Sequence, residues 1–251
     1  MAEAVENARK DVANLLNAQQ NEIIFTSGAT ESNNIAIKGV ARYQGHTKPH
    51  VITSKIEHKC VLESVRELEA EGLQPHFIGV DSEGLLLMDE LDDVLKTFDG
   101  KVSLLSVMAA NNEVGTIQDI KALAKRAHKH GALFHSDCAQ IAGKRPLDVR
   151  DLDLDLASLS GHKMHGPKGV GALFVNKQRR VRLRPIFSGG GQESNIRSGT
   201  VPVFLCAGMG EAAAIAKQEL RQDVQHYEDL SKLAMDELAG VKGTYLNGSA
   251  R

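Results

Sequence analysis

Short apolar runs alternate along the chain with longer segments in which apolar residues recur with a helical period. Runs of the first kind predict buried strands, and segments of the second kind predict amphipathic helices. The predicted strands are 22–26, 50–53, 75–80, 101–108, 132–135, 154–159 and 170–175. The predicted helices are 3–16, one from the turn at 27–30 to about residue 43, 58–71, 88–96, 120–130 and 202–239. This alternation predicts an α/β fold with a mainly parallel sheet and helices on both of its faces.

The pattern changes after Gly191. A helix rich in Ala and Glu is expected to end at Gly240, and residues 241–246 predict one more strand. Residues 177–184 alternate basic with apolar side chains, which favours a half-solvated strand over a nucleic-acid surface because no aromatic residues are interleaved. We therefore expect a large domain over 1–205, and a linking helix with the start of a truncated smaller domain over 206–251.

Composition excludes several functional classes. The formal net charge is −2, so the whole chain has no general attraction for nucleic acids or anionic membranes. No apolar run is long enough to span a bilayer, and the acidic N-terminal segment resembles neither a secretory signal nor a transit peptide. Three dispersed cysteines, Cys60, Cys138 and Cys206, fit free thiols in a reducing compartment. We expect no direct nucleic-acid binding and no membrane association.

Polar residues follow several of the predicted strands: Gly28, His58, Asn112, Asp137 and Lys163. Ligands of parallel α/β sheets bind beyond the carboxyl ends of the strands, so these residues predict a site. A desolvated lysine amine is a nucleophile toward carbonyl groups. Taken alone, however, a lysine in this Gly- and Pro-containing segment is more often an ordinary surface residue.

Two segments could bind phosphate. Residues 27–30 join a strand to a helix N-terminus, where unpaired N–H groups favour anions, although an ordinary helix cap is the commoner explanation. The glycine-rich loop, residues 188–200, could bring its backbone close to a phosphate, with Thr200 as a further donor. A flexible linker is the alternative for this loop.

The other candidate residues also have structural explanations. Asp137 ends a buried strand, where a carboxylate needs a cation or hydrogen-bond donors, yet it could simply cap a helical turn. His58 could stack on a planar cofactor or move protons, or begin a helix. Asn112 could bind a ligand or close an Asx turn. His162 and His165 lack a nearby acidic ligand, so no metal site is predicted. A lysine nucleophile with an aspartate for a pyridinium nitrogen is the pair that pyridoxal phosphate (PLP) requires.

Six ordered segments carry a family resemblance. They are GATESNN (28–34), EHKCVLES (57–64), NNEVGTIQ (111–118), HSDCAQ (135–140), SGHKMHGPKGVGALFV (160–175) and GGGQESNIRSGT (189–200). Together they resemble the cysteine desulfurases of iron–sulfur cluster assembly, which are PLP enzymes of the class-V aminotransferase family with the type I fold. The match extends through nearly the whole chain.

The resemblance implies a role for each matching residue. Lys163 corresponds to the Schiff-base lysine and, with His58, is an expected catalytic residue. His58 would stack on the PLP ring, Asp137 would contact the ring nitrogen, and Gln140 the ring hydroxyl. The implied phosphate site contains Ala29, Thr30, Ser160, Gly161 and His162. Asn112 would lie at the cofactor and substrate, and Thr200 would reach the phosphate of a neighbouring subunit in a homodimer.

The resemblance also implies the reaction. L-cysteine would give alanine and an enzyme persulfide, whose sulfur passes to an iron–sulfur scaffold or another sulfur acceptor, in the bacterial cytoplasm or the mitochondrial matrix. The family's Ser-Gly-Ser-Ala-Cys-type loop and its N-terminal opening motif are absent, and we expect that loop beyond Arg251. Cys60, two residues after His58, is the only cysteine with a case for replacing the missing nucleophile, and a helix-core position is expected for it. A selenocysteine lyase or other class-V enzyme, and a non-catalytic fragment that binds PLP or a partner, remain alternatives.

Overall fold

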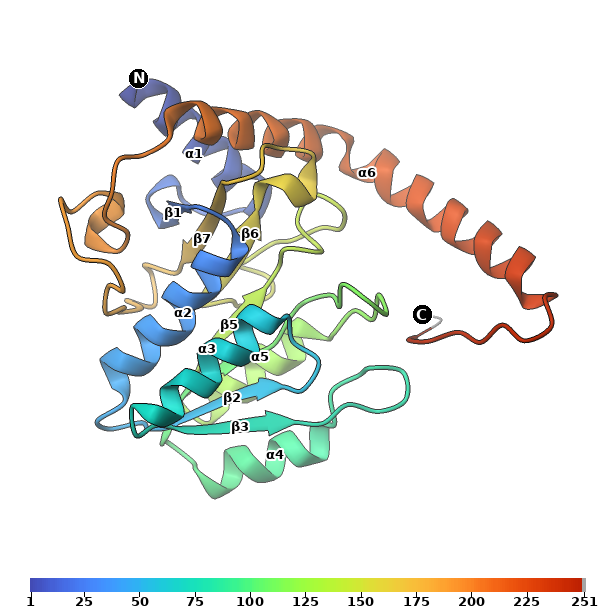
Figure 1. The fold of residues 1–251 in the computed structure, drawn as a ribbon, viewed down its shortest axis with the longest axis horizontal. Coiled ribbons are helices and arrows are strands. Elements are labelled where there is room, and N and C mark those ends of the chain that lie inside the picture. The colour runs from blue at the N-terminus through green and yellow to red at the C-terminus, as the bar shows by residue number, and fades with distance from the viewer. Residues whose placement is uncertain (250–251) are drawn as a thin grey trace.

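A seven-stranded sheet forms the centre of the protein in the computed structural model, which describes residues 1–249 (Figure 1). The strands are β1 (Ile23–Thr26), β2 (His50–Ser54), β3 (Gln74–Ile78), β4 (Val102–Ser106), β5 (Leu133–Asp137), β6 (Leu156–Ser160) and β7 (Gly171–Val175). Their order is β1-β7-β6-β5-β4-β2-β3. The pairs from β3 to β6 are parallel, whereas β7 is antiparallel to both β6 and β1. The predicted mainly parallel sheet is confirmed.

Helices cover both faces of this sheet, as predicted (Figure 1). The helices are α1 (Ala2–Leu16), α2 (Ala29–Gln44), α3 (Lys59–Ala70), α4 (Met88–Thr97), α5 (Ile120–Lys129) and α6 (Val203–Ala239), with 3-10 turns η1 (Gln20–Glu22), η2 (Gly161–Met164) and η3 (Glu193–Asn195). Apolar residues of α2 and α3 form one core layer, and those of α1, α4, α5 and the beginning of α6 form the other. Strands β2, β4 and β6 are buried along their whole length, as expected for parallel strands that helices cover on both faces.

The parallel arrangement determines where the site can form. Because β2, β4, β5 and β6 run in the same direction, the segments after their last residues lie at one edge of the sheet. The turn after β1 reaches the same edge, since β7 pairs antiparallel with both β1 and β6. Gly171 of β7 allows this close approach, because a Cβ atom there would lie 2.6 Å from the Cα of Gly28.

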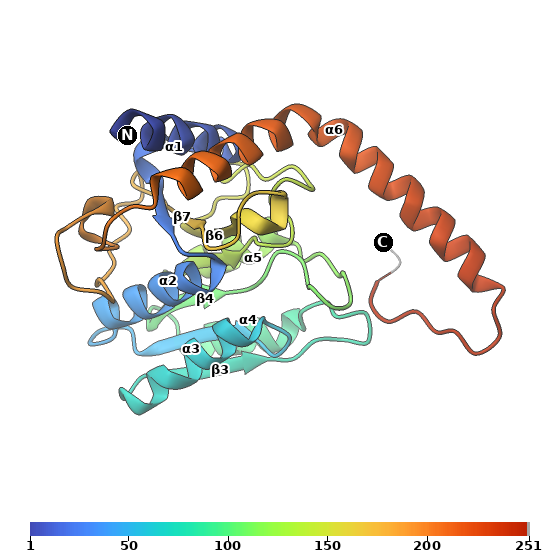
Figure 2. The same ribbon diagram turned by 45° about the horizontal axis from the view of Figure 1, so that its top comes forward.

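The long helix α6 has two unlike halves (Figure 2). Its first half packs along α1 and buries Cys206, Met209 and Ala213. Its second half extends away from the sheet, and residues 225–239 are all exposed. An ion pair of 2.6 Å between Arg145 and Glu228 joins this half to the loop after β5. No helix among the described residues combines the length and the apolar character that crossing a bilayer requires.

Two predicted strands are wrong. Residues 241–246 form a turn and coil in which the Thr244 N–H donates to the Val241 carbonyl, and no strand within residues 1–249 pairs with them. Residues 177–184 keep the predicted alternation, with Val181 and Leu183 packed on the core, but no partner strand completes a ladder. Arg184 instead donates its backbone N–H to Gly39 of α2. The expected boundary between residues 205 and 206 falls inside α6, and the second domain stays a prediction.

Candidate active site

A cavity of about 420 Å³ opens at the carboxyl edge of the sheet. It collects residues from the ends of four strands and from the N-terminus of α2. The sequence-predicted residues that line it are Ala29, Thr30, His58, Asn112, Asp137, Gln140, Ser160, His162 and Lys163. Residues far apart in the sequence therefore meet here, as the order of the parallel strands requires.

Lys163 lies in η2, immediately after β6. The turn is closed by a hydrogen bond of 2.9 Å from the backbone N–H of Gly166 to the carbonyl of Gly161, and His165 adopts a left-handed conformation. Lys163 makes no hydrogen bond or ion pair with any residue in the described range 1–249. Its amine is therefore available to a ligand in the cavity.

Asp137 is the buried carboxyl group of the cavity, with 6% of its surface exposed. One oxygen accepts a hydrogen bond of 2.7 Å from the Asn33 amide, and the other accepts the backbone N–H of Ala139 at 3.0 Å. Burial raises the pKa of Asp137, although these hydrogen bonds and the positive charges of His58 and Lys163 oppose the shift. A cationic N–H group in the cavity would favour the ionised form.

His58 precedes α3, and its ring accepts a hydrogen bond of 3.2 Å at Nδ1 from the backbone N–H of Cys60. A backbone N–H can only donate, so Nδ1 is the acceptor and the neutral ring carries its proton on Nε2. Cys60 Sγ lies 3.0 Å from the same nitrogen. The sulfur accepts a hydrogen bond from the Asn33 side-chain amide. Cys60 packs partly against the core, as expected, but it also lines the cavity.

Hydrogen-bond donors for an anion converge on one side of the cavity. The N-terminal residues of α2, Ala29 and Thr30, have backbone N–H groups without partners inside the helix. After β6, Ser160 Oγ and His162 Nδ1 lie 3.0 Å apart, and both residues line the same cavity. The Ser27 N–H belongs to a different interaction, because it donates to Glu31 at 2.5 Å.

The two asparagines after β4, Asn111 and Asn112, have different structural positions. The side-chain oxygen of Asn111 accepts backbone N–H groups of Glu113 and Val114, at 2.8 and 2.9 Å, and so closes an Asx turn. Asn112, one position later, lines the cavity.

Gln140 also lines the cavity, and its side-chain oxygen accepts a hydrogen bond of 3.4 Å from the Lys144 amine. The pKa of Lys144 is lowered by burial and by the charge of Lys163.

Two predicted residues do not line the cavity. Gly161 is buried behind it and donates its N–H to Val170 at 3.0 Å, and a Cβ there would meet Val170 at 3.0 Å. Thr200 lies in the glycine-rich loop and lines two other surface pockets. Of the two histidines considered for a metal, His162 lines the cavity and His165 faces a smaller pocket. Within residues 1–249 no cluster of three His, Cys, Asp or Glu could hold a metal ion.

Sequence reasoning missed two buried polar residues behind the cavity. Asn33 is fully buried on the inner face of α2. Because it lies four residues after Ala29, it shares a helix face with that residue, and this spacing could have indicated its place near the cavity. Glu57 accepts from Ser54 Oγ at 2.6 Å and from the Met108 N–H at 2.9 Å, and so ties the turn before His58 to the end of β4. Burial raises the pKa of Glu57 to about 8.

The class-V aminotransferase family model matches residues 1–251. The chain belongs to this family. The mitochondrial cysteine desulfurase of Saccharomyces cerevisiae is 49% identical over 246 residues, which are 98% of this chain and 49% of that protein. Cysteine desulfurase IscS of Rickettsia bellii is 48% identical over 98% of this chain and 59% of its own length. The chain thus spans about half the length of the curated relatives it matches.

Solved structures agree with this family assignment. A NifS-like protein superposes with a TM-score of 0.89 at 41% identity, covering 95% of this chain and 64% of that one. The structure named SspA in complex with cysteine has a TM-score of 0.79 at 42% identity, covering 84% of this chain and 60% of its own. The predicted type I fold and the family resemblance are confirmed.

Proposed function

We propose that this chain is the cofactor-binding part of a PLP-dependent cysteine desulfurase. The observation that carries the proposal is the meeting, in one cavity, of an unpaired lysine, a buried aspartate and a set of anion donors. The identity of nearly half of the residues to desulfurases over almost the whole chain supports the same conclusion. Because the relatives are about twice as long, the activity and partners of the whole protein belong to the proposal.

The donor set fits PLP group by group. Asp137 is buried and makes hydrogen bonds that stabilise its charged form, and a pyridinium N–H would add a cationic hydrogen-bond donor to this carboxylate. The N-terminus of α2, Ser160 and His162 would hold the phosphate, while Gln140 would reach the ring hydroxyl. The flat imidazole of His58 would lie against the ring.

Bound PLP would supply an electron sink that stabilises negative charge at the substrate Cα. Lys163 would hold the aldehyde end of the cofactor and, once released, would take or return the proton at Cα. His58 carries its neutral-state proton on Nε2, so it would act first as a proton donor or hydrogen-bond donor. Asn112 would help to orient the substrate. Thr200 would act in the cavity of a second copy, which implies a homodimer.

Sulfur transfer needs an acceptor thiol. Cys138 and Cys206 are buried, and burial raises the pKa of their thiols to about 12 and about 11 respectively. Cys60 lines the cavity, but burial also raises its pKa, which makes it a poor nucleophile at neutral pH. We therefore propose that these 251 residues bind L-cysteine and desulfurate it poorly. The whole protein would pass sulfur to a scaffold or another acceptor in the bacterial cytoplasm or the mitochondrial matrix.

Cofactor binding is tested by titrating the purified protein with PLP. We expect an absorbance band distinct from that of free PLP, which borohydride removes and which is lost in Lys163→Ala. Lys168→Ala is the matched control, because Lys168 also lines the cavity and should leave the band intact. A band that survives Lys163→Ala, or no band in the wild-type protein, would overturn the proposal.

Substrate choice is tested with the loaded protein. L-cysteine should shift the spectrum, whereas alanine, and sulfide when an added thiol reduces the released sulfur, should appear slowly without a longer chain. A selenocysteine lyase would instead release selenium from selenocysteine, as selenide when the same thiol reduces it, and give no sulfide or alanine from cysteine.

A further inference from the structure

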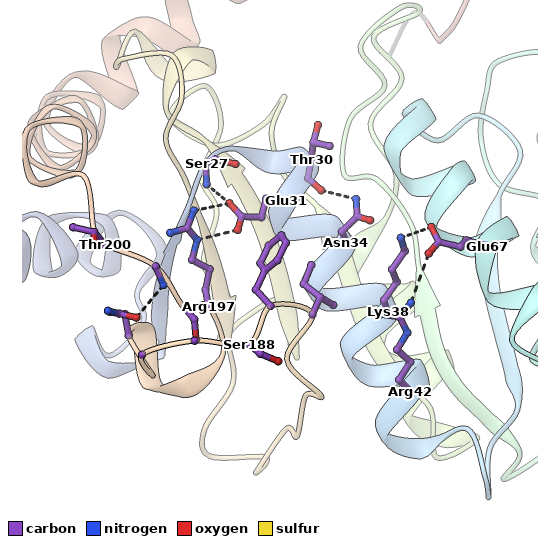
Figure 3. A pocket seen from close by; sticks show the side chains of 17 residues that line it. Ser27, Thr30, Glu31, Asn34, Lys38, Arg42, Glu67, Ser188, Arg197 and Thr200 are labelled. Atoms are coloured by element: carbon purple, nitrogen blue, oxygen red, sulfur yellow. Dashed lines mark hydrogen bonds and ion pairs between the residues drawn. The ribbon is translucent and has the colours of Figure 1, made fainter.

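A second pocket, of about 960 Å³, lies between α2 and the glycine-rich loop (Figure 3). It shares Ser27 and Thr30 with the active-site cavity. At this shared wall Glu31 of α2 points toward Arg197 of the loop, as the close-up shows. The wall therefore connects the anion donors at the start of α2 with the loop.

Glu31 and Arg197 form a largely buried ion pair. Arg197 Nε donates to Glu31 Oε1 at 2.9 Å, and the exposed fractions of the side chains are 20% for Arg197 and 9% for Glu31. The same carboxylate accepts the Ser27 N–H. Burial alone would raise the pKa of Glu31, but the hydrogen bonds from Arg197 and Ser27 lower it, so Glu31 is negatively charged.

A second ion pair holds the middle of the loop. Glu193 accepts from both terminal nitrogens of Arg9, at 2.6 and 2.8 Å, and from the Phe25 N–H at 2.7 Å. Its side chain is only 3% exposed. Glu193, Ser194 and Asn195 all have positive φ, which is costly for residues other than glycine. The Arg9–Glu193 contacts hold this strained turn, and so the loop has a defined position against β1 and α2.

The position of Glu31 creates an electrostatic conflict. A carboxylate in the first turn of α2 repels an anion bound at the Ala29 and Thr30 N–H groups, and the repulsion is strong in a partly buried site. Arg197 is the cation that cancels it. The pocket also contains Lys38 and Arg42, which lie farther along α2, but these pair with Glu67 of α3 and with Glu71, the residue that follows α3.

We propose that Arg197 acts on the anion site by neutralising Glu31, so that the seating of the glycine-rich loop sets the affinity of the cavity for the phosphate of its ligand. This inference rests on the proposed function for the identity of the ligand. It assigns Arg197 and Glu31 as positioning residues and couples the loop to cofactor retention. Displacement of the loop would leave an uncompensated carboxylate beside the phosphate and release the ligand.

A double-mutant cycle on Arg197 and Glu31 (the charge cycle) tests the proposal. The affinity of the apo-protein is measured separately for PLP and for inorganic phosphate. Arg197→Ala should weaken the binding of both by about tenfold, the size expected for an uncompensated unit charge near the anion. Glu31→Gln should bind at least as tightly as the wild-type protein, and the double variant should recover wild-type affinity to within about threefold. Arg42→Ala removes the same charge from the same pocket and should change neither affinity.

The double variant separates the possible causes. If Arg197 contacted the phosphate itself, or only supported the fold, adding Glu31→Gln would restore nothing, and the proposal would be overturned. Unchanged affinity in Arg197→Ala would overturn it as well. Failure of PLP to bind wild-type protein refutes the proposed function, and inorganic phosphate still tests the charge cycle. If neither ligand binds the wild-type protein, both proposals fail.

Discussion

Polar residues toward the amino ends of the parallel strands differ in their pairing from those at the carboxyl ends of the same sheet. At the amino end His50 and His76 bond to each other, with Nδ1 and Nε2 2.9 Å apart, and His50 stacks on Phe98 with ring centroids 3.8 Å apart. At the carboxyl end Lys163 has no partner among the described residues, and Asp137 is buried beside a cavity. The two histidines at the amino end pair within the chain, whereas Lys163 at the carboxyl end leaves its amine for a ligand.

The difference has an energetic consequence. Buried polar groups that are paired only partly by the chain cost stability, and a protein keeps them where a ligand completes the pairing. The raised pKa values of Asp137 and Glu57 are signs of this cost at the carboxyl end. Substitutions at the carboxyl end should therefore change ligand binding more than stability. Substitutions at the amino end should change stability and leave ligand binding unaltered.

Asp137→Asn should give the largest effect. The substitution removes the negative charge that would hold a pyridinium, and a hydrogen bond between charged groups contributes about 1.5–3 kcal/mol. PLP affinity should fall roughly 100-fold in a spectroscopic titration. The unfolding free energy of the apo-protein should change by less than about 1 kcal/mol, because one lost hydrogen bond offsets the relief of a buried charge. Unchanged affinity would remove Asp137 from the ligand site.

Glu57→Gln should have a smaller effect, which depends on pH. The folded-state pKa of Glu57, about 8, lies above its ordinary value, so its stabilising contribution is present at low pH and is lost as pH rises toward 8. The wild-type protein should lose about 2 kcal/mol through this group between pH 6 and 8. Urea unfolding at these two pH values should show a smaller loss in Glu57→Gln. Equal losses in both proteins would mean that Glu57 is already ionised at pH 6.

His76→Phe should have the smallest effect. Burial lowers the pKa values of both His50 and His76, and nearby positive charges add to the effect, so the folded state resists their protonation. Stability conferred by the neutral pair should decrease as pH falls below about 6.5. The unfolding temperature should fall less between pH 7 and pH 5 in the variant than in the wild-type protein. The PLP affinity of the variant should be unchanged. An altered affinity would show that the two ends are not independent.

The helices and the central strands were predictable because their burial follows from local periodicity. The 241–246 and 177–184 strands were not, because a strand exists only where another strand pairs with it, and sequence alternation cannot supply that neighbour. The antiparallel direction of β7 was also inaccessible, since a strand buried on both faces has the same apolar pattern in either direction.

The cavity was largely predictable, because parallel strands bring their carboxyl ends together. Asn33 and Glu57 were missed because a buried polar residue next to a strand or on a helix looks like a solvent-facing one until the packing is known. Gly161 matches the family pattern but bonds to Val170 within the fold. The role of Thr200 depends on a second copy and stays a prediction.

The most direct test of the central claim is to identify the residue that holds the cofactor. The PLP-loaded protein would be reduced with borohydride, digested with a protease and mapped by mass spectrometry. We expect a single reduced adduct, on Lys163. An adduct on Lys144 or Lys168 instead, or no adduct on any lysine, would contradict it.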